Sequence, residues 1–343
     1  MTRARVFARL ASALGPVWAF LAVLCAGFLL ILAISSDPLL AYRDLLLSNF
    51  ASASNFALFL NRLMPLLLIG LGVIFSFRAG VFNIGGEGQL YLGAIAAASV
   101  ALALPNLPHA LALALPIAAS VLAGAVYGWI PGALKVGLEV NEVVSTLMLN
   151  FVALLLTEYL VTNPLRDPVA YGAVSYVVPH SSWLAEIPGL PGSTVGSIVA
   201  IAIAPIAWVS LFRTAWGANL RAAGSNMRFA ETVGVHGKRL VLQAMAISGG
   251  LAGLAGGFYV LGIGHRFEQN FSPSFGLVGL TVALLARLHP IGLVATAAIY
   301  ALILNGAAYM QIDTDVPRSL VALLTGILVL IMTMRPRRGP AEA

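Results

Sequence analysis

Long apolar runs separated by short polar segments dominate this chain and predict its secondary structure. Nine runs have the roughly 17–25 residues that a helix needs to cross a hydrocarbon core of about 30 Å. The tenth, residues 276–286, is too short to cross alone, so we expect a broken or re-entrant element there. We therefore predict an all-α polytopic membrane protein with about ten transmembrane helices, forming one domain over residues 1–343. The predicted spans are 17–35, 57–76, 84–104, 110–130, 143–162, 194–212, 240–263, 276–286, 291–309 and 318–334.

Composition agrees with this class. The 343 residues are 60% hydrophobic and 9% charged, whereas soluble domains carry about 25% charged residues. The lone cysteine, Cys25, leaves no partner for an internal disulfide, and the five histidines lack metal-ligand spacing. We interpret residues 17–35 as a retained first span, because they exceed the roughly 7–15 apolar residues of a signal peptide.

The basic residues predict the orientation. With the N-terminus inside, fourteen of the nineteen lysines and arginines fall on the inner side and five on the outer side. This agrees with the positive-inside rule and places both termini and residues 213–239 in the cytoplasm. The net charge of +6 is therefore attributed to cytoplasmic loops, and no nucleic-acid partner is expected.

Residues 213–239 form a polar interruption with helical periodicity. Apolar residues recur at three- and four-residue intervals on one face, and polar residues occupy the other. Gly224 is expected to break the helix, Ser225 or Asn226 to cap a second piece, and Gly234 to end it. The segment predicts a cytoplasmic docking surface; the alternative is a helix lying on anionic lipid. The apolar face comprises Leu220, Ala223, Met227, Ala230 and Val233, and the polar face Arg221, Ser225, Arg228, Glu231 and Thr232.

The longest outer segment, residues 163–193, is rich in proline, glycine and aromatic residues. Loops of this length are uncommon without a function of their own. Two interpretations remain open here: a surface that binds a partner, and a lid over the outer helix ends.

Residues 77–93 place Asn83, Glu87 and Gln89 beside five glycines, between two apolar runs. Glycines interrupt helices, and an acid near membrane depth usually faces a cavity or a partner. One interpretation is a discontinuous helix whose polar groups line a substrate pathway. The alternative is a cytoplasmic turn in which Glu87 pairs with Arg78.

Two further positions are candidates for the same pathway. Asn150 lies within the span 143–162, whereas Glu142 stands where the helix dipole favours an acid, and Ser145 and Thr146 can bond back to their own helix. Phe271 opens a polar entry near the C-terminus that faintly echoes the entry at residue 77 from the opposite side. The echo suggests an inverted repeat.

No catalytic constellation is visible. The sequence has no nucleophile–base pair, no paired carboxylates and no phosphate-binding loop of the G-x-x-x-x-G-K-[ST] type. We expect a transport subunit that is not an enzyme and needs no cofactor or metal. If ATP drives it, a separate subunit must bind the nucleotide.

Four linked motifs resemble the permease subunits of bacterial ABC importers of the ribose/branched-chain amino acid class, especially those for simple sugars and purine nucleosides. They read FRAGVFNIGGEGQ, EVNEVVSTLMLN, LRAAGSNMRFAETVGV, and GLTVALLARLHPIG with MQIDTDVP, from residue 77 to residue 317. The sequence departs from the family where Phe229–Ala230 replaces a more common Ala-Ala pair and where ARLHPIG replaces a GRxNPxG ending.

This resemblance implies a permease in the bacterial inner membrane that pairs with itself or a sister permease. It also implies two cytoplasmic ATPase subunits and an extracytoplasmic substrate-binding protein. It assigns residues 213–239 the role of coupling helix; the expected coupling residues are Leu220, Arg221, Ala222, Ala223, Gly224, Asn226, Glu231 and Gly234. The expected cargo is a small neutral polar solute: a nucleoside first, then a sugar, then an amino acid.

The alternative function is an ion-coupled secondary transporter built on the inverted repeat. Such a machine needs intramembrane ionisable groups, and Glu87 is the single plausible proton carrier. A non-transporting scaffold has no positive sign in the sequence. The sequence leaves open the exact solute and whether the second permease is identical.

Overall fold

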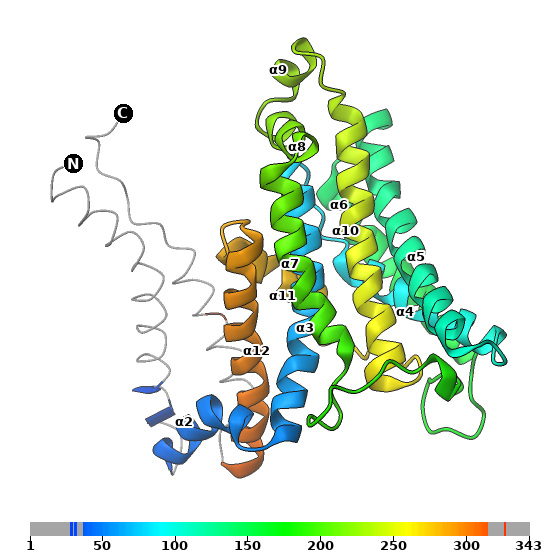
Figure 1. Cartoon of the computed structure of the whole chain (residues 1–343), viewed down its shortest axis with the longest axis vertical. Helices are drawn as coiled ribbons and strands as arrows, with labels where there is room; N and C mark the ends of the chain where they lie inside the picture. Colours follow the sequence, from blue (N-terminus) through cyan, green and yellow to red (C-terminus); the bar gives the residue numbers. More distant parts are fainter. Residues whose placement is uncertain (1–27, 30, 33–36, 315–325, 327–343) are drawn as a thin grey trace, which may run out of the picture. The chain divides into compact units, whose positions relative to one another are not determined.

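The computed structural model describes residues 28, 29, 31, 32, 37–314 and 326, and its regular elements are helices (Figure 1). The chain divides into two compact units, residues 56–301 and residues 1–55 together with 302–343. The helices are α2 (Pro38–Leu47), α3 (Ala53–Arg78), α4 (Gly86–Ala103), α5 (His109–Leu138), α6 (Glu142–Thr162), α7 (Val195–Arg213), α8 (Ala215–Ser225), α9 (Met227–Thr232), α10 (Gly237–Tyr259), α11 (Phe275–Leu285) and α12 (Pro290–Asp313). Short helical turns occur at Ser48–Phe50, His180–Ser182 and, in π-helical form, Val260–Gly264.

Eight predicted spans lie in the described part of the chain, and each is a helix at the expected place. Among the described residues, six helices are long and apolar enough to cross a membrane; α4 is not one of them, and α11 is a shorter apolar helix, as expected for residues 276–286. The spans predicted at 17–35 and 318–334 lie largely outside the described residues. The all-α polytopic membrane fold is therefore confirmed.

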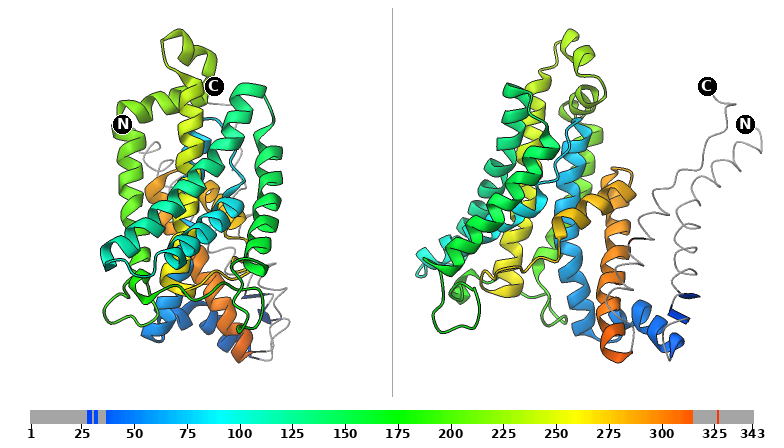
Figure 2. Two further views of the ribbon diagram at one scale, coloured as in Figure 1. Left: turned by 90° about the vertical axis from the view of Figure 1, so that its right-hand side faces the viewer. Right: turned by 180° about the vertical axis from the view of Figure 1, so that it is seen from behind.

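Helices α4, α5, α6 and α10 lie side by side in residues 56–301 (Figures 1 and 2). Glycines spaced four residues apart on α5 and α10 let these two helices approach closely. A Cβ on Gly128 would lie 2.9 Å from the Gly249 Cα, and one on Gly249 would lie 2.9 Å from the Gly128 Cα. Because the obstacle is backbone on both sides, these contacts require glycine. A Cβ on Gly93 of α4 would likewise meet the backbone of Gly253 in α10. We call Gly93, Gly124, Gly128, Gly249 and Gly253 the glycine seam.

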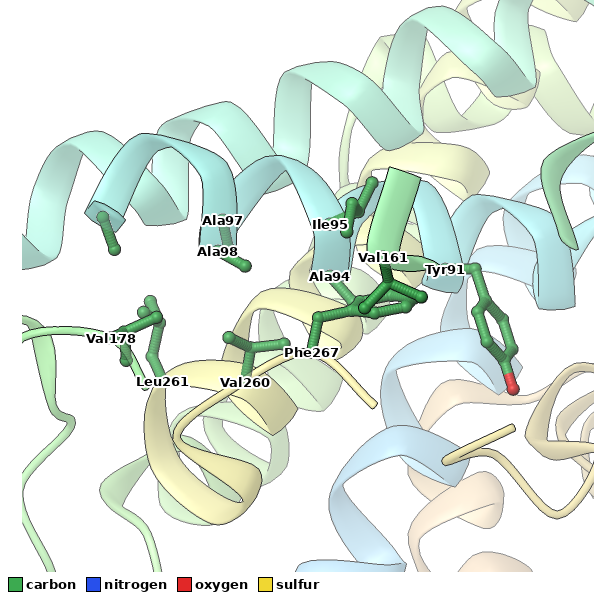
Figure 3. Close-up of a cluster of buried hydrophobic side chains, with 11 residues drawn as sticks. Tyr91, Ala94, Ile95, Ala97, Ala98, Val161, Val178, Val260, Leu261 and Phe267 are labelled. Atoms are coloured by element: carbon green, nitrogen blue, oxygen red, sulfur yellow. The ribbon is translucent and has the colours of Figure 1, made fainter. Parts of the chain in front are cut away.

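An apolar cluster extends this core toward the outer segment. Ala94, Ala97 and Ala98 of α4 pack there with Val260 and Leu261 at the end of α10 (Figure 3). Val178 of the outer segment belongs to the same buried cluster.

The second unit is held together by amide hydrogen bonds. Asn49 donates to the Leu302 carbonyl oxygen at 3.0 Å and accepts from Asn305 Nδ2 at 2.9 Å. A side chain at Gly306 would strike the backbone of Leu45. Helix α2 was not predicted, and Asp37 caps it by accepting from the Leu40 N–H at 3.1 Å.

Two predicted boundaries are wrong. The span predicted to stop at residue 130 continues as α5 through Pro131 and Gly132 to Leu138, where Glu139 ends it in a left-handed conformation. Gly224 does not break the helix in the segment 213–239, because α8 runs through it to Ser225. The break falls at Asn226, whose side chain caps α9 by accepting from the Phe229 N–H at 3.0 Å.

Candidate functional site

Between α3 and α4 the chain leaves the helical conformation for seven residues, 79–85. Gly80 has φ +78°, which allows the sharp exit from α3. Val81, Asn83 and Gly85 are buried, so their backbone groups need partners other than water. We call residues 79–85 the polar break. It separates α3 from α4, as both interpretations of residues 77–93, the discontinuous helix and the turn, allow.

Asn83 organises the polar break through four hydrogen bonds. Its Nδ2 donates to Ser248 Oγ at 2.8 Å and to Gln89 Oε1 at 3.1 Å. Its Oδ1 accepts from the Gly85 N–H at 2.9 Å and from Gln89 Nε2 at 3.2 Å. Asn83 and Gln89 are each 1% exposed. The two amides thus tie the break to α4 and α10.

Asn150 and Thr146 tie the same break to α6. Asn150 Nδ2 donates to the Ile84 carbonyl oxygen at 3.0 Å, and its Oδ1 accepts from the Gly88 N–H at 2.8 Å. The Ile84 N–H donates to Thr146 Oγ1 at 3.4 Å. Thr146 also bonds back to the Glu142 carbonyl oxygen at 2.6 Å, as its position in the helix predicted. These side chains substitute for the hydrogen bonds that a continuous helix would have made.

Glu87 connects the break to α11 and does not pair with Arg78. Its Oε2 accepts from the Gly276 N–H at 2.6 Å, a favourable place for an acid at the start of a helix. Arg78 instead donates to the Leu288 carbonyl oxygen at 2.9 Å and 3.2 Å. Glu87 itself is partly exposed, unlike Asn83 and Gln89.

An aromatic group lies next to Glu87. Phe271 stacks on Tyr259 with ring centroids 4.4 Å apart and lies 4.6 Å from the Tyr91 ring. The Ser272 N–H donates to the Tyr91 hydroxyl at 3.3 Å. In Figure 3 this hydroxyl points away from the apolar cluster that contains Phe267. Glu87, Tyr259 and Phe271 are partly exposed and form the accessible side of this region.

The predicted pathway residues therefore divide into two groups. Asn83, Gln89 and Asn150 make their hydrogen bonds with the chain itself. Glu87 and Phe271 are partly exposed. Among the described residues there is no group of three or more His, Cys, Asp or Glu side chains that could hold a metal ion.

Residues 213–239, the segment predicted to be cytoplasmic, contain two short helices, α8 and α9. Leu220, Ala223 and Ala230 are buried, as the predicted apolar face requires, but Val233 is 61% exposed. Asn226, Glu231 and Gly234 are exposed, and Arg221, Ala222 and Gly224 are partly buried. Phe229, between Arg228 and Glu231, is 61% exposed. The outward surface of α9 therefore combines an apolar ring with charges of both signs.

Gly224 makes its close approach within the chain. A Cβ on Gly224 would lie 2.8 Å from the Gly80 nitrogen, and one on Gly80 would lie 3.0 Å from the Gly224 Cα. The end of α8 thus rests on the backbone that leaves α3. This contact and the hydrogen bond from Asn83 to Ser248 were not predicted, since each joins positions more than 140 residues apart and leaves no local signal.

The outer segment is irregular but anchored. Trp183 stacks on His265 with ring centroids 3.7 Å apart and donates from Nε1 to the Val178 carbonyl oxygen at 3.0 Å. Burial lowers the pKa of the His265 imidazole, which favours a neutral ring in this stack. Tyr171, by contrast, is fully exposed. Both interpretations of the segment, partner surface and lid, agree with this mixture.

Comparison with known proteins identifies the family. Residues 55–333 match the family described as branched-chain amino acid transport system / permease component. The chain is 32% identical over 327 residues to the guanosine ABC transporter permease protein NupP of Bacillus subtilis, covering 94% of each chain. It is 28% identical to the nucleoside ABC transporter permease protein NupB of Lactococcus lactis, covering 90% of this chain and 87% of that one.

A sugar permease is similar to a comparable degree. The glucose ABC transporter permease protein TsgB13 of Haloferax volcanii is 30% identical, covering 92% of this chain and 86% of the relative. No solved structure matches the chain. The matched length and the identity to these permeases show that the chain belongs to the ABC-transporter permease family described as branched-chain amino acid transport system / permease component.

Proposed function

We propose that this permease moves a nucleoside across the bacterial inner membrane as part of an ATP-driven importer, with a sugar as the second candidate. The observation that carries this proposal is similarity over nearly the whole chain to a guanosine permease. The break between α3 and α4 supports it, because it places buried polar side chains within an apolar protein.

In this proposal the solute contacts the partly exposed side chains of Glu87 and Phe271. Asn83, Gln89 and Asn150 lie behind them and hold the break through hydrogen bonds within the chain. A carboxylate accepts hydrogen bonds from sugar hydroxyls or nucleobase N–H groups, and aromatic rings offer faces to a base or an apolar sugar face. In this function the permease performs no enzymatic step, and separate subunits hydrolyse the ATP.

The proposed partners are two cytoplasmic ATPase subunits, a second permease and an extracytoplasmic substrate-binding protein, with both termini in the cytoplasm. Helices α8 and α9 bind the ATPase through their exposed residues, including Asn226, Glu231 and Gly234. The buried Leu220 and Ala223 fix α8 against the rest of the chain. Arg221, Ala222 and Gly224 lie between these buried residues and the exposed ones. The outer segment 163–193 faces the substrate-binding protein.

Co-purification from native membranes, with mass spectrometry of every bound subunit, tests the assembly. We expect an ATPase and a permease, and the double variant Phe229→Ala/Glu231→Arg should lose the ATPase. Tyr171→Ala, equally exposed but on the outer segment, should retain it. A wild-type chain that elutes without an ATPase would contradict the proposed assembly.

Uptake by the reconstituted complex tests the solute. Guanosine and glucose are offered separately to proteoliposomes that contain ATP. We expect ATP-dependent guanosine uptake that glucose does not compete away and that a protonophore leaves unchanged. Glucose uptake alone would replace the nucleoside by a sugar, and protonophore-sensitive uptake at constant ATP would contradict the ATP-driven mechanism.

A further inference from the structure

Two arginines from distant parts of the chain lie against one aromatic ring at the inner end of α7. The Arg221 Cζ is 4.8 Å from the Phe212 ring centroid, and the Arg78 Cζ is 5.5 Å from it. Arg221 also donates to the Leu211 carbonyl oxygen. Within the described residues neither guanidinium forms an ion pair. The neutral Phe212 ring and carbonyl oxygens therefore hold the two positively charged guanidinium groups close together, without a carboxylate between them.

Arg78 extends this contact to the turn between α11 and α12. Its Nε and Nη2 both donate to the Leu288 carbonyl oxygen, at 3.2 Å and 2.9 Å. Arg287 and Leu288 have φ values of +53° and +55°, a conformation that non-glycine residues adopt only where the surroundings impose it. His289 follows directly, with its ring centroid 5.5 Å from that of Phe212.

The same turn leads to the polar break. Helix α11 ends at Leu285 just before the turn and begins at Phe275, beside the Gly276 N–H that donates to Glu87. At Gly279, α11 lies close against α3: a Cβ there would lie 2.8 Å from Ile69 Cγ2. A displacement of the turn along the axis of α11 therefore reaches Glu87 through one short, rigid helix.

In the opposite direction, away from α11, the turn is connected to α8 through Arg78 in two ways. Arg221 of α8 shares the Phe212 ring with Arg78, and Gly224 of α8 rests on the backbone of Arg78 and Gly80. Helix α8 cannot shift without moving this backbone, because no flexible side chain lies between them. Contacts are thus continuous from α8 through Arg78, Leu288 and α11 to Glu87.

We propose that Arg78 is the positioning residue that transmits movement of α8 to the α11–α12 turn and so to the pathway at Glu87. This inference rests on the proposed function, in which α8 receives the movement of the ATPase. Arg78 suits the role because a guanidinium can donate two hydrogen bonds to one carbonyl oxygen while its face lies on an aromatic ring. Lysine keeps the charge but cannot reproduce this geometry.

The first test is Arg78→Lys in the complete complex, with guanosine uptake and ATP hydrolysis measured in the same proteoliposomes. We expect the number of guanosine molecules moved per ATP to fall about tenfold, as the loss of a charged hydrogen bond would give. ATP hydrolysis should stay within about twofold of wild type, since α9 is unaltered. Arg213→Lys is the matched control, because Arg213 lies 5.3 Å from the Trp208 ring at the same end of α7.

Two results overturn the inference: unchanged guanosine moved per ATP, or equal losses of uptake and hydrolysis, which indicate a role in assembly alone. Failure of wild type to move any nucleoside or sugar contradicts the proposed function instead. Separate evidence comes from spin labels at Ser225→Cys and Arg287→Cys in a Cys25→Ala background with Arg78 intact. The label-to-label distance should be unchanged by ATP, because α8 and the turn move together, and a shift of several ångströms would overturn the inference.

Discussion

The glycine seam and the polar break bring backbones close together by opposite means. In the seam between α5 and α10, side chains are absent and helix backbone meets helix backbone, as at Gly128 and Gly249. In the polar break, side-chain amides replace the missing helical hydrogen bonds, as Asn83 does toward Gly85. The seam is destabilised by any added atom, whereas the break is destabilised by the loss of a hydrogen bond. The two regions therefore differ in which substitution harms them.

The comparison teaches where this permease can be rigid and where it can change. A seam of backbone contacts has one good arrangement, because interiors are close-packed and resist added volume. A set of amide hydrogen bonds can exchange partners if water or a solute supplies equivalent ones. We infer that α4, α5 and α10 move as a unit and that conformational change is concentrated at the break.

Gly253→Ala should have the largest effect. The added methyl group meets the Ser120 carbonyl oxygen and lies 3.0 Å from the Gly124 Cα, and backbone cannot move aside. We expect a loss of about 3 kcal/mol, visible as a lower unfolding midpoint in detergent. Gly250→Ala on the same helix is the matched control, because its Cβ comes no closer than 3.4 Å to a neighbour, Val121 Cγ1. Equal midpoints for the two variants would refute the seam.

Asn83→Ala should cause the second largest loss of stability. It removes hydrogen-bonding atoms, whereas Gly253→Ala adds a methyl group. The substitution leaves the Gly85 N–H and the Gln89 amide without their partners in a buried site. We expect a loss of about 2 kcal/mol, since a buried polar group left unsatisfied costs about 1–3 kcal/mol. Ser99→Ala is the control, because Ser99 bonds only back to the Ile95 carbonyl oxygen. A midpoint for Asn83→Ala no lower than that for Ser99→Ala would show that water replaces the amide.

The two regions also differ in how far the sequence predicts them. Apolar runs predicted the two helices on either side of the break, and the glycines near residue 85 predicted the position of the break itself. Asn150 could be singled out as a polar residue inside a span, but its partner Ile84 could not, because that contact depends on how α4 packs against α6. Ser248 gave no signal, since a serine among glycines and alanines is ordinary in an apolar helix. Local pattern predicts elements, and the pairing of distant polar groups requires the fold.

Glu87→Ala should have a smaller effect on stability than Asn83→Ala. Glu87 is partly exposed and accepts one backbone hydrogen bond, from the Gly276 N–H. We expect a loss of about 1 kcal/mol, and Glu87→Gln should recover most of it because the amide oxygen still accepts. Unfolding midpoints of the two variants measure the difference. Equal losses for Gln and Ala would show that the negative charge, and not the hydrogen-bond acceptor alone, joins the break to α11.

Gly234→Ala should have the smallest effect on global stability, because Gly234 belongs neither to the glycine seam nor to the polar break. Gly234 needs glycine for conformation alone: its φ is +85°, and an added Cβ meets nothing within 4 Å. We expect about 1 kcal/mol of local strain, confined to α9, which would raise amide hydrogen exchange around residues 227–235 without lowering the global midpoint. Gly137→Ala is equally free of neighbours but lies within α5, so it should slow local exchange because alanine favours a helix. A global loss at Gly234 as large as that at Gly253 would mean that α9 is part of the rigid core, and the distinction between packing glycines and turn glycines would fail.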